Sequence, residues 1–557
     1  MVFFHILIVI CTPHRVNSLS ICRGYHCTGT SGSHYNIYFA NNYYSMEFAS
    51  DHFAIVHILN QYWLTLLLVI SMVLISRTFV AGTRYSPILI IVVFGLIMGY
   101  IMVGTGLATP GLPEFPIVEL TSRVTITALM ASFFVGGQEI RKLFANQKID
   151  PEDMVVPSSQ ELFLGTKATQ FMFLIRGFFI LTGIEALRRM VTGYSTGEPL
   201  DQFYPLLGYI GLVASIILID HRAKITNKAV YIRKGIYETA VIILVLTAAF
   251  HIASWIRPFI ALPEIFFAMI ISVALGMFMV RWQFGPTIKS LLFAGIPIVL
   301  AANFMVGGSR IAEAFALTGM TSVLSFGFFG QLLWMFGGLA ILILLGNANH
   351  IRNLAPGMAG SLSHSGLTGA CTAGDLGPQA AIRAPIMINI PFIGHIFVFS
   401  ILAASATAGK LLIPYTLAVV LAGLILTFFA LKILRSGVGE EQSEIRGLMI
   451  FSLGWQLVAV FGGLFLLDIS GMPLADAVMA NASAISHFGL FAAIQEGMFG
   501  AEAAGMIAFV FAMPFLVHPL VFGIFGKAAE NDGIMPAKTV YFLALLGVVG
   551  VLYSMIF

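Results

Sequence analysis

The chain has 557 residues, of which 58% are hydrophobic and only 10% are charged, and its formal net charge is +3. A soluble domain carries about 25% charged residues, so this composition excludes an ordinary soluble protein. The small net charge and the absence of a basic tract give no reason to expect a nucleic-acid partner.

Backbone polar groups that face lipid must be hydrogen-bonded within the protein, which leaves helices and closed barrels as spanning structures. The apolar runs of this chain are longer and more uniform than the alternating strands of a barrel. We therefore predict an all-α polytopic membrane protein of about 13–14 transmembrane helices, since each span needs roughly 20 apolar residues. Its surroundings would be the lipid bilayer of the cell inner membrane.

The first 45 residues differ from the rest of the chain. Residues 1–11 form a short apolar run that no Ala-x-Ala cleavage site follows, and no Asp or Glu precedes Glu47. The interpretation we favour is that 1–45 is a poorly structured segment outside the packed protein, with Met46 as an alternative start.

The predicted spans follow in chain order. They lie near 61–79, 87–105, 119–137, 169–187, 204–220, 236–255, 263–280, 288–305, 322–345, 385–405, 411–432, 447–467, 502–526 and 538–556. Short cytoplasmic loops of membrane proteins are enriched in Lys and Arg. In this chain most loop Lys and Arg residues lie on the cytoplasmic side when both termini are placed outside. The outer loops then hold only Arg188, Arg189, Arg257, Arg310 and Lys410.

Three landmarks recur along the chain. Tyr62 and Pro87 of the first copy correspond to Tyr237 and Pro263 of the second. The third landmark is FFVGGQEIRKLF (133–144), which ends the third span, and its counterpart is FMVGGSRIAEAF (304–315), which ends the eighth. Five spans separate the copies, so the copies cross in opposite directions, as in the inverted repeats of many secondary transporters. We predict a first repeat over 46–222, a second over 223–405, and a C-terminal transmembrane extension over 406–557.

A polar segment rich in Gly, Ser, Thr and Ala separates the ninth and tenth spans, and we predict a re-entrant loop over 354–384. A flexible cytoplasmic loop is the alternative. Amides of an unwound segment bind anions, while carbonyls and hydroxyls bind sodium. The candidate substrate- and ion-binding residues of this loop are Ser361, Ser363, His364, Ser365, Thr368, Gly369, Thr372 and Asp375.

Ionisable and polar residues inside spans supply further candidates. His395 could titrate near neutral pH or bond to a neighbouring helix. Arg176 could be the counter-charge of a carboxylate or a structural partner of Glu185, and Asn303 could offer a ligand carbonyl or an interhelical bond. A second polar patch, 476–502 with His487 and Glu496, is either another re-entrant element or an amphipathic periplasmic helix. We favour the helix, because we identified no repeat mate for the patch.

Several segments resemble the bacterial sodium/glutamate symporter family over about residues 60–405. They are SPILIIVVFGLIMG (86–99), ITALMASFFVGGQEI (126–140), LPEIFFAMIISVALG (262–276), GLTGACTA (366–373) and NIPFIGHIFVFSILA (389–403). The resemblance implies two five-helix inverted repeats with re-entrant loops and sodium-coupled uptake of an acidic amino acid. The chain departs from the family at Cys371, which replaces a motif proline, and at Phe399, where an acid is expected.

We therefore expect a secondary active transporter that moves a small anionic solute or amino acid, glutamate-like, by alternating access. The coupling ion is sodium or a proton, no other cofactor is expected, and a homodimer is left open. The alternatives are a cation:proton antiporter, which the lack of paired acids within a span disfavours, and a membrane-embedded enzyme or redox subunit. HExxH and CxxCH are absent from the sequence, so we do not expect an enzyme.

Overall fold

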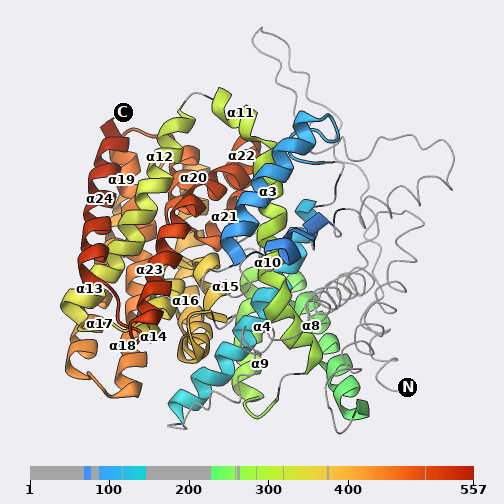
Figure 1. Cartoon of the computed structure of the whole chain (residues 1–557), viewed down its shortest axis with the longest axis vertical. Helices are drawn as coiled ribbons and strands as arrows, with labels where there is room; N and C mark the ends of the chain where they lie inside the picture. Colours follow the sequence, from blue (N-terminus) through green and yellow to red (C-terminus); the bar gives the residue numbers. More distant parts are fainter. Residues whose placement is uncertain are drawn as a thin grey trace, which may run out of the picture.

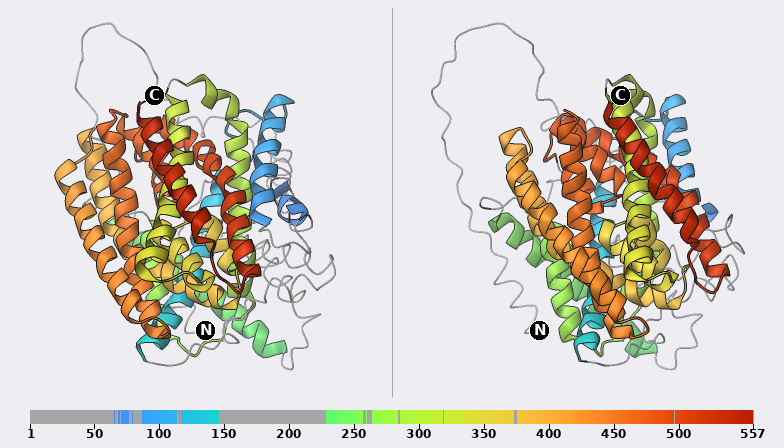
Figure 2. Two further views of the ribbon diagram at one scale, coloured as in Figure 1. Left: turned by 60° about the vertical axis from the view of Figure 1, so that its left-hand side comes forward. Right: turned by 90° about the vertical axis from the view of Figure 1, so that its left-hand side faces the viewer.

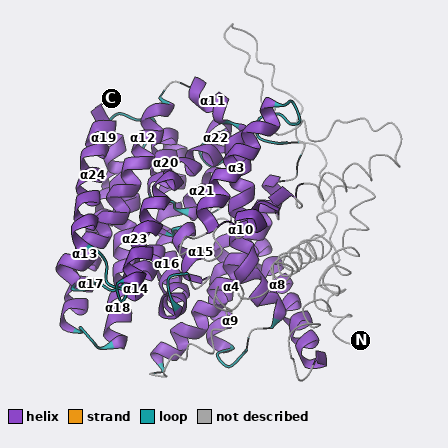
Figure 3. Cartoon of the chain, viewed as in Figure 1, coloured by secondary structure: helices purple, strands orange, loops and turns teal. Residues whose placement is uncertain are grey.

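The computed structural model describes residues 65, 68–69, 71–76, 79, 87–113, 115, 117–145, 228–256, 259, 264–283, 285–317, 319–372, 375–495 and 497–556. These residues form helices and no strand, and the long helices run alongside one another through the molecule (Figures 2 and 3). The segment 1–45, the predicted spans near 169–187 and 204–220, and Arg176 lie outside the described residues.

Seven helices of the described part are long and apolar enough to cross a membrane. They are Arg233–Ile256, Met320–Gly346, Pro378–Ala408, Ile413–Ser436, Glu441–Ile469, Ala501–Glu530 and Ala537–Ile556. Three shorter apolar stretches accompany them, Ile88–Gly104, Glu264–Phe278 and Gly295–Ser309. The prediction of an all-α, multi-pass membrane protein is confirmed, because stretches of this length and hydropathy belong in lipid.

The first group of helices occupies the right-hand side of Figure 1. It consists of α3 (Pro87–Gly104), α4 (Ile117–Phe144), α8 (Lys228–Ile256), α9 (Glu264–Phe278) and α10 (Pro286–Ser309). Helix α3 packs along α10, and α4 packs along both α9 and α10. The short helix α11 (Ile311–Ala316) then leads to the second group.

Glycines bring these helices into backbone contact in a reciprocal pattern. A Cβ atom on Gly99 of α3 would lie 2.0 Å from the carbonyl oxygen of Met305 in α10, and one on Gly276 of α9 would lie 2.1 Å from that of Phe134 in α4. Small residues let membrane helices approach this closely. The contact of α3 with α10 is thus equivalent to the contact of α9 with α4, so the landmark copies ending at 144 and 315 occupy equivalent positions in the two halves of this group.

The second group holds two copies of one helical unit. The first copy contains α12 (Met320–Gln331), the π-helical turn η2 (Leu332–Phe336), α13 (Gly337–Gly346), α14 (Ile351–Leu362), α15 (Ser365–Thr372), α16 (Pro378–Ala408) and α17 (Ile413–Ser436). The second contains α18 (Glu441–Leu457), the π-helical turn η3 (Val458–Gly462), α19 (Gly463–Ile469), α20 (Leu474–Ala484), α21 (Phe488–Gln495), α22 (Ala501–Ala512), the 3₁₀ turn η4 (Met513–Val517), α23 (His518–Glu530) and α24 (Ala537–Ile556).

In each copy, two short helices form a hairpin that enters the protein and turns back. Near the base of the first hairpin, Asn353 of α14 accepts a hydrogen bond from Arg383 of α16, so the chain returns to the level at which it entered. Near the base of the second, Asp476 of α20 lies close enough to Glu502 of α22 for the two charges to interact. Each copy thus has three crossing helices and one hairpin. Because an odd number of crossings ends the first copy on the side opposite to its start, the second copy begins there and is inverted relative to the first.

This arrangement corrects two expectations. The segment 406–557, predicted as a C-terminal extension, divides between the two copies: α17 belongs to the first, and α18–α24 repeats α12–α17. The patch at 476–502 is not an amphipathic surface helix, because residues such as Asn481, Ser483 and His487 are fully buried. Its small residues serve the same purpose as those of 354–384, which is to let an interrupted helix enter a packed interior.

The entry to the first hairpin provides a pH-dependent prediction. His350 caps α14, since its Nδ1 accepts a hydrogen bond from the Arg352 backbone N–H at 3.2 Å. Burial, followed by the positive charge of Arg352, lowers the pKa of His350 below 6.5, although the Asp532 backbone and Glu444 oppose the shift. A lowered histidine pKa supports stability above about pH 6.5, and this support is lost as the pH falls towards the folded-state value. We expect His350→Asn, which keeps a capping oxygen, to reduce the fall in melting temperature between pH 7.5 and 5.5.

The control for this prediction is His251→Asn on the exposed face of α8. It should leave the pH dependence of the melting temperature unchanged. Equal pH dependence in the His350→Asn variant and the unaltered protein would contradict the assignment.

Candidate functional site

The tips of the two hairpins meet inside the second group of helices. His364 and His487 form an isolated antiparallel bridge there, and both side chains are fully buried. The residues before them, Ser363 and Ser486, each have φ near 50°, a left-handed conformation that ends one helix before the next begins. Each histidine then caps the helix that follows, since its Nδ1 accepts from a backbone N–H three residues on, at 3.1 Å.

A glutamine from each copy joins the two tips. Gln331 Nε2 lies 3.1 Å from His364 Nε2 and 3.2 Å from the Oγ of Ser486. Gln456 Nε2 lies 3.0 Å from His487 Nε2 and 3.0 Å from the Oγ of Ser363. Each glutamine therefore contacts the histidine of its own hairpin and the serine of the other. Gln331 immediately precedes the π-helical turn η2, and Gln456 lies two residues before η3; such turns occur often at functional sites.

The caps determine the protonation pattern of this centre. Because Nδ1 of each tip histidine accepts a hydrogen bond, a neutral ring carries its proton on Nε2. An Nε2–H facing a glutamine needs an acceptor, and the side-chain oxygens of Gln331 and Gln456 would have no hydrogen-bond partner if they pointed away from the histidines. Nitrogen and oxygen of an amide are assigned from the network. We therefore assign the amide oxygen of each glutamine to the side facing the histidine and serine, and the single Nε2–H of His364 is then shared between Gln331 and the Nε2 of His518.

A second pair of histidines lies beside the first. His518 Nε2 is 3.0 Å from His364 Nε2, and their ring centroids are 4.6 Å apart. The ring of His395 lies 4.7 Å from that of His487, centroid to centroid. The motif Pro-Phe-x-x-His places both residues, with Pro391 and Pro514 four positions earlier. Glycines at 366 and 489 give these rings space, since a Cβ at either would lie 2.7 Å from the ring of His518 or His395.

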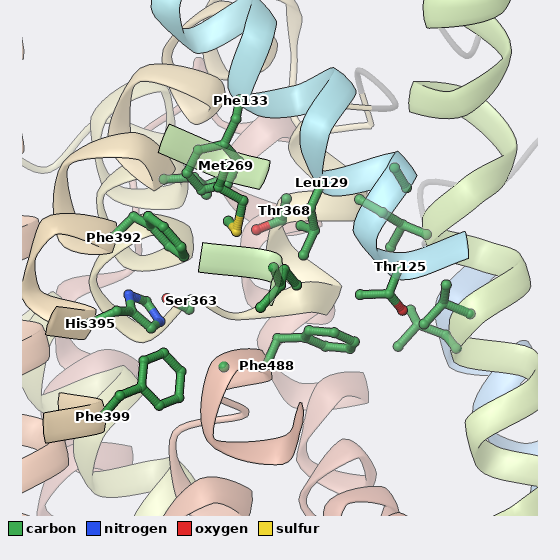
Figure 4. Close-up of a pocket in the computed structure, with 17 residues that line it drawn as sticks. Thr125, Leu129, Phe133, Met269, Ser363, Thr368, Phe392, His395, Phe399 and Phe488 are labelled. Atoms are coloured by element: carbon green, nitrogen blue, oxygen red, sulfur yellow. The ribbon is translucent and has the colours of Figure 1, made fainter. Parts of the chain in front are cut away.

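The two halves of this histidine cluster, His364, His395, His487 and His518, are not equivalent. His395 borders a cavity between the hairpins and the first group of helices (Figure 4), whereas His518 is hydrogen-bonded to His364. The cavity is lined by Thr125, Ala128, Leu129, Phe133, Ile265, Met269, Ile296, Val299, Leu300, Ser363, Thr368, Ile388, Phe392, His395, Phe399, Phe488 and Gly489. No Asp, Glu, Lys or Arg is among these described residues. The cavity is apolar apart from hydroxyls, one imidazole and backbone.

The structure brings only some predicted site residues together. His364, Ser363, His395 and Thr368 belong to the cluster or the cavity. Ser361 is buried within α14, where its hydroxyl donates to the Met358 carbonyl at 3.3 Å.

The other candidates of the loop lie elsewhere. Gly369 faces α3, because a Cβ there would lie 2.9 Å from Ile88, while Ser365 and Thr372 are the first and last residues of α15. Asp375 is in the turn between α15 and α16, at the base of the hairpin. It is therefore not part of the histidine cluster, although it was predicted as a cation or proton site. Asn303 is buried in α10, and its amide nitrogen has no hydrogen-bond partner.

Three central residues were not predicted as site residues: Gln331, Gln456 and His518. His487 was noted only as part of the C-terminal patch. A signal for all of them exists in the sequence, because Gln-Leu-x-x-x-Phe-Gly-Gly-Leu, Ser-His-x-Gly-Leu and Pro-Phe-x-x-His each occur twice in the same order. Among the described residues, no group of three or more His, Cys, Asp or Glu side chains is arranged to hold a metal ion.

No known protein family, curated protein or solved structure matches this chain. The function must therefore be argued from the site itself.

Proposed function

We propose that the chain is a proton-coupled secondary active transporter that works by alternating access. The observation that carries this proposal is the pair of oppositely inserted hairpins whose tips, His364 and His487, meet in the interior. Interrupted helices leave backbone groups without helical partners, which membrane proteins tolerate where those groups line a cavity. Inverted repeats with interrupted helices at their interface are the common architecture of secondary transporters.

The chemistry of the centre favours a proton over sodium as the coupling ion. Sodium sites in such proteins are formed by carbonyl oxygens and the C-terminal ends of half-helices. Here the buried centre consists of four imidazoles linked by amides and hydroxyls. Histidine is the side chain whose charge changes most readily near physiological pH. A cation:proton antiporter would need carboxylates at this position, and none lines the described cavity.

The inequality of the two halves supports alternating access. His518 contacts His364 at 3.0 Å, whereas His395 faces the cavity. Two halves with the same residues in inverted orientation can exchange these roles at a small cost in free energy, since the exchange replaces one set of contacts by its mate. In the opposite state we expect His395 to be hydrogen-bonded to His487 and His518 to face a cavity.

Uptake into proteoliposomes tests the proposal. A panel of glutamate, leucine, lactate and phenylpyruvate would be offered under a pH gradient or a sodium gradient, imposed separately. We expect at least one solute to accumulate under the pH gradient alone. His364→Gln and His487→Gln should each lower the initial rate by roughly tenfold or more, because both remove a proton-carrying group. His251→Gln on α8 is the control. No accumulation under either gradient, or accumulation under sodium alone that the variants leave unchanged, would refute the proposal.

A further inference from the structure

We propose that the cavity beside His395 binds a monocarboxylic acid with an apolar body, and that each molecule is taken up with one proton. The inference deepens the proposed transport function and rests on it for the direction of movement. Its binding part stands separately on the walls of the cavity, the groups at its polar end and the charges that it lacks.

The walls select an apolar body. Phe133, Phe392, Phe399 and Phe488 surround the cavity together with Met269 and other aliphatic side chains (Figure 4). Aromatic and aliphatic walls bury an apolar or aromatic group favourably. An acidic amino acid would place a second carboxylate and an ammonium group against the same walls. Neither would find a partner there, and an unpaired charge in such surroundings is costly.

The polar end presents donors for a carboxylate. Phe488 and Gly489 line the cavity and are the first two residues of α21, so helix carbonyls cannot satisfy their N–H groups. The N-terminal end of a helix also carries a partial positive charge. His395 lies at the same place, because a Cβ on Gly489 would be 2.7 Å from its Nε2. The ring is only 3% exposed, and its Nδ1 lies on the side of the Pro391 and Phe392 backbone carbonyls, so its Nε2 is the buried polar atom that a ligand in the cavity can reach.

Because the cavity lacks a positively charged residue, a proton must accompany the acid. No Lys or Arg is among its described lining residues, so a carboxylate alone would remain an uncompensated negative charge. The compensating charge is available if His395 takes up a proton and forms an imidazolium–carboxylate pair. The occupied site has the same number of protons and the same net charge if the acid enters already protonated. Both descriptions give one proton for each carboxylate and no net movement of charge.

Isothermal titration calorimetry of the purified full chain in detergent tests the inference with phenylacetate as the probe. Titrations in two buffers of different ionisation enthalpy give the number of protons taken up on binding. At pH 7.5 we expect phenylacetate to bind with close to one proton. Glutamate and the uncharged analogue phenylacetamide should bind at least about tenfold more weakly, the loss expected when a hydrogen bond to a charged group is missing.

Two variants make the assignment specific. His395→Gln should lower the affinity for phenylacetate at least about tenfold and abolish proton uptake, because an amide cannot take up the proton. Gly489→Ala should weaken binding as well, because its methyl group would displace the His395 ring. His251→Gln should match the unaltered protein. Phenylacetate binding without proton uptake, or equally tight binding of phenylacetamide, would overturn the inference.

The failure of this inference differs from the failure of the proposed function. Glutamate binding more tightly than phenylacetate, with uptake still driven by the pH gradient, would refute the substrate class and leave the transporter. Phenylacetate binding with one proton, with no solute moved under either gradient, would refute transport and leave the binding site.

Discussion

Alanine at Gly99 or at Gly276 is expected to lower the melting temperature of the purified protein far more than alanine at Gly104. The new methyl carbon would lie 2.0 Å from the carbonyl oxygen of Met305 in the first case and 2.1 Å from that of Phe134 in the second. These are backbone atoms, so the helices must move apart. Overpacking of this kind costs about 1–3 kcal/mol. The reciprocal geometry also predicts nearly equal losses at the two sites.

Gly104 is the matched control, because it lies at the end of the same helix as Gly99 and no atom lies within 4 Å of its added Cβ. Thermal unfolding in detergent, followed by circular dichroism, gives the comparison directly. Helix propensity alone favours alanine over glycine by about 1 kcal/mol, so Gly104→Ala should be neutral or stabilising. If all three variants unfolded at the same temperature, the close packing of α3 on α10 and of α9 on α4 would be wrong.

Replacing Arg383 with methionine is expected to be the most destabilising change at the base of the first hairpin. The Arg383 side chain is 3% exposed; it donates to Asn353 and Glu441 and lies 3.5 Å from Glu444, Nη1 to Oε2. Glu444 also pairs with Arg352 at 3.5 Å. Removing one partner of a buried ion pair costs about 3–5 kcal/mol. Because Glu444 keeps its pair with Arg352 and Glu441 is exposed, we expect a loss at the lower end of that range.

A second substitution distinguishes this cause from a general packing defect. Glu444→Gln in the Arg383→Met background removes the carboxylate that has lost Arg383 as a partner and should recover part of the lost free energy of unfolding. Arg435→Met, on an exposed position of α17, is the control and should have little effect. An additive loss in the double variant would show that the two charges do not interact.

The membrane-spanning helices could be predicted from the sequence because lipid imposes a simple requirement on length and polarity. The predicted span near 322–345 corresponds to the helix 320–346, and the span near 538–556 corresponds to α24 (Ala537–Ile556). Among the candidate site residues, His364 and His395 could be selected because a histidine is costly in such a segment. Asp375 was selected by the same rule, yet it lies in a turn at the base of the hairpin, where its charge is more easily accommodated.

The partners of those histidines could not be predicted from local pattern. Gln331 reaches Ser486 across 155 positions of the chain, and His518 reaches His364 across 154. The free-energy cost of placing a residue in a membrane span singles out ionisable side chains, so it does not point to an uncharged glutamine. Hydropathy does not distinguish the second hairpin from an ordinary polar segment. The duplicated motifs were the only local signal, and they became meaningful once the two copies were seen to be inverted and packed together.

The sequence by itself determined that this protein lies in a membrane, that it is helical and where most of its helices run, because each of those properties follows from how many consecutive residues lipid accepts. The tertiary structure alone decided that residues 441–556 are an inverted copy of 320–436, that two hairpins meet tip to tip, and that four histidines form one buried cluster. Those features depend on contacts between residues that are as many as 155 positions apart in the chain. No local property of a segment indicates which distant segment will pack against it.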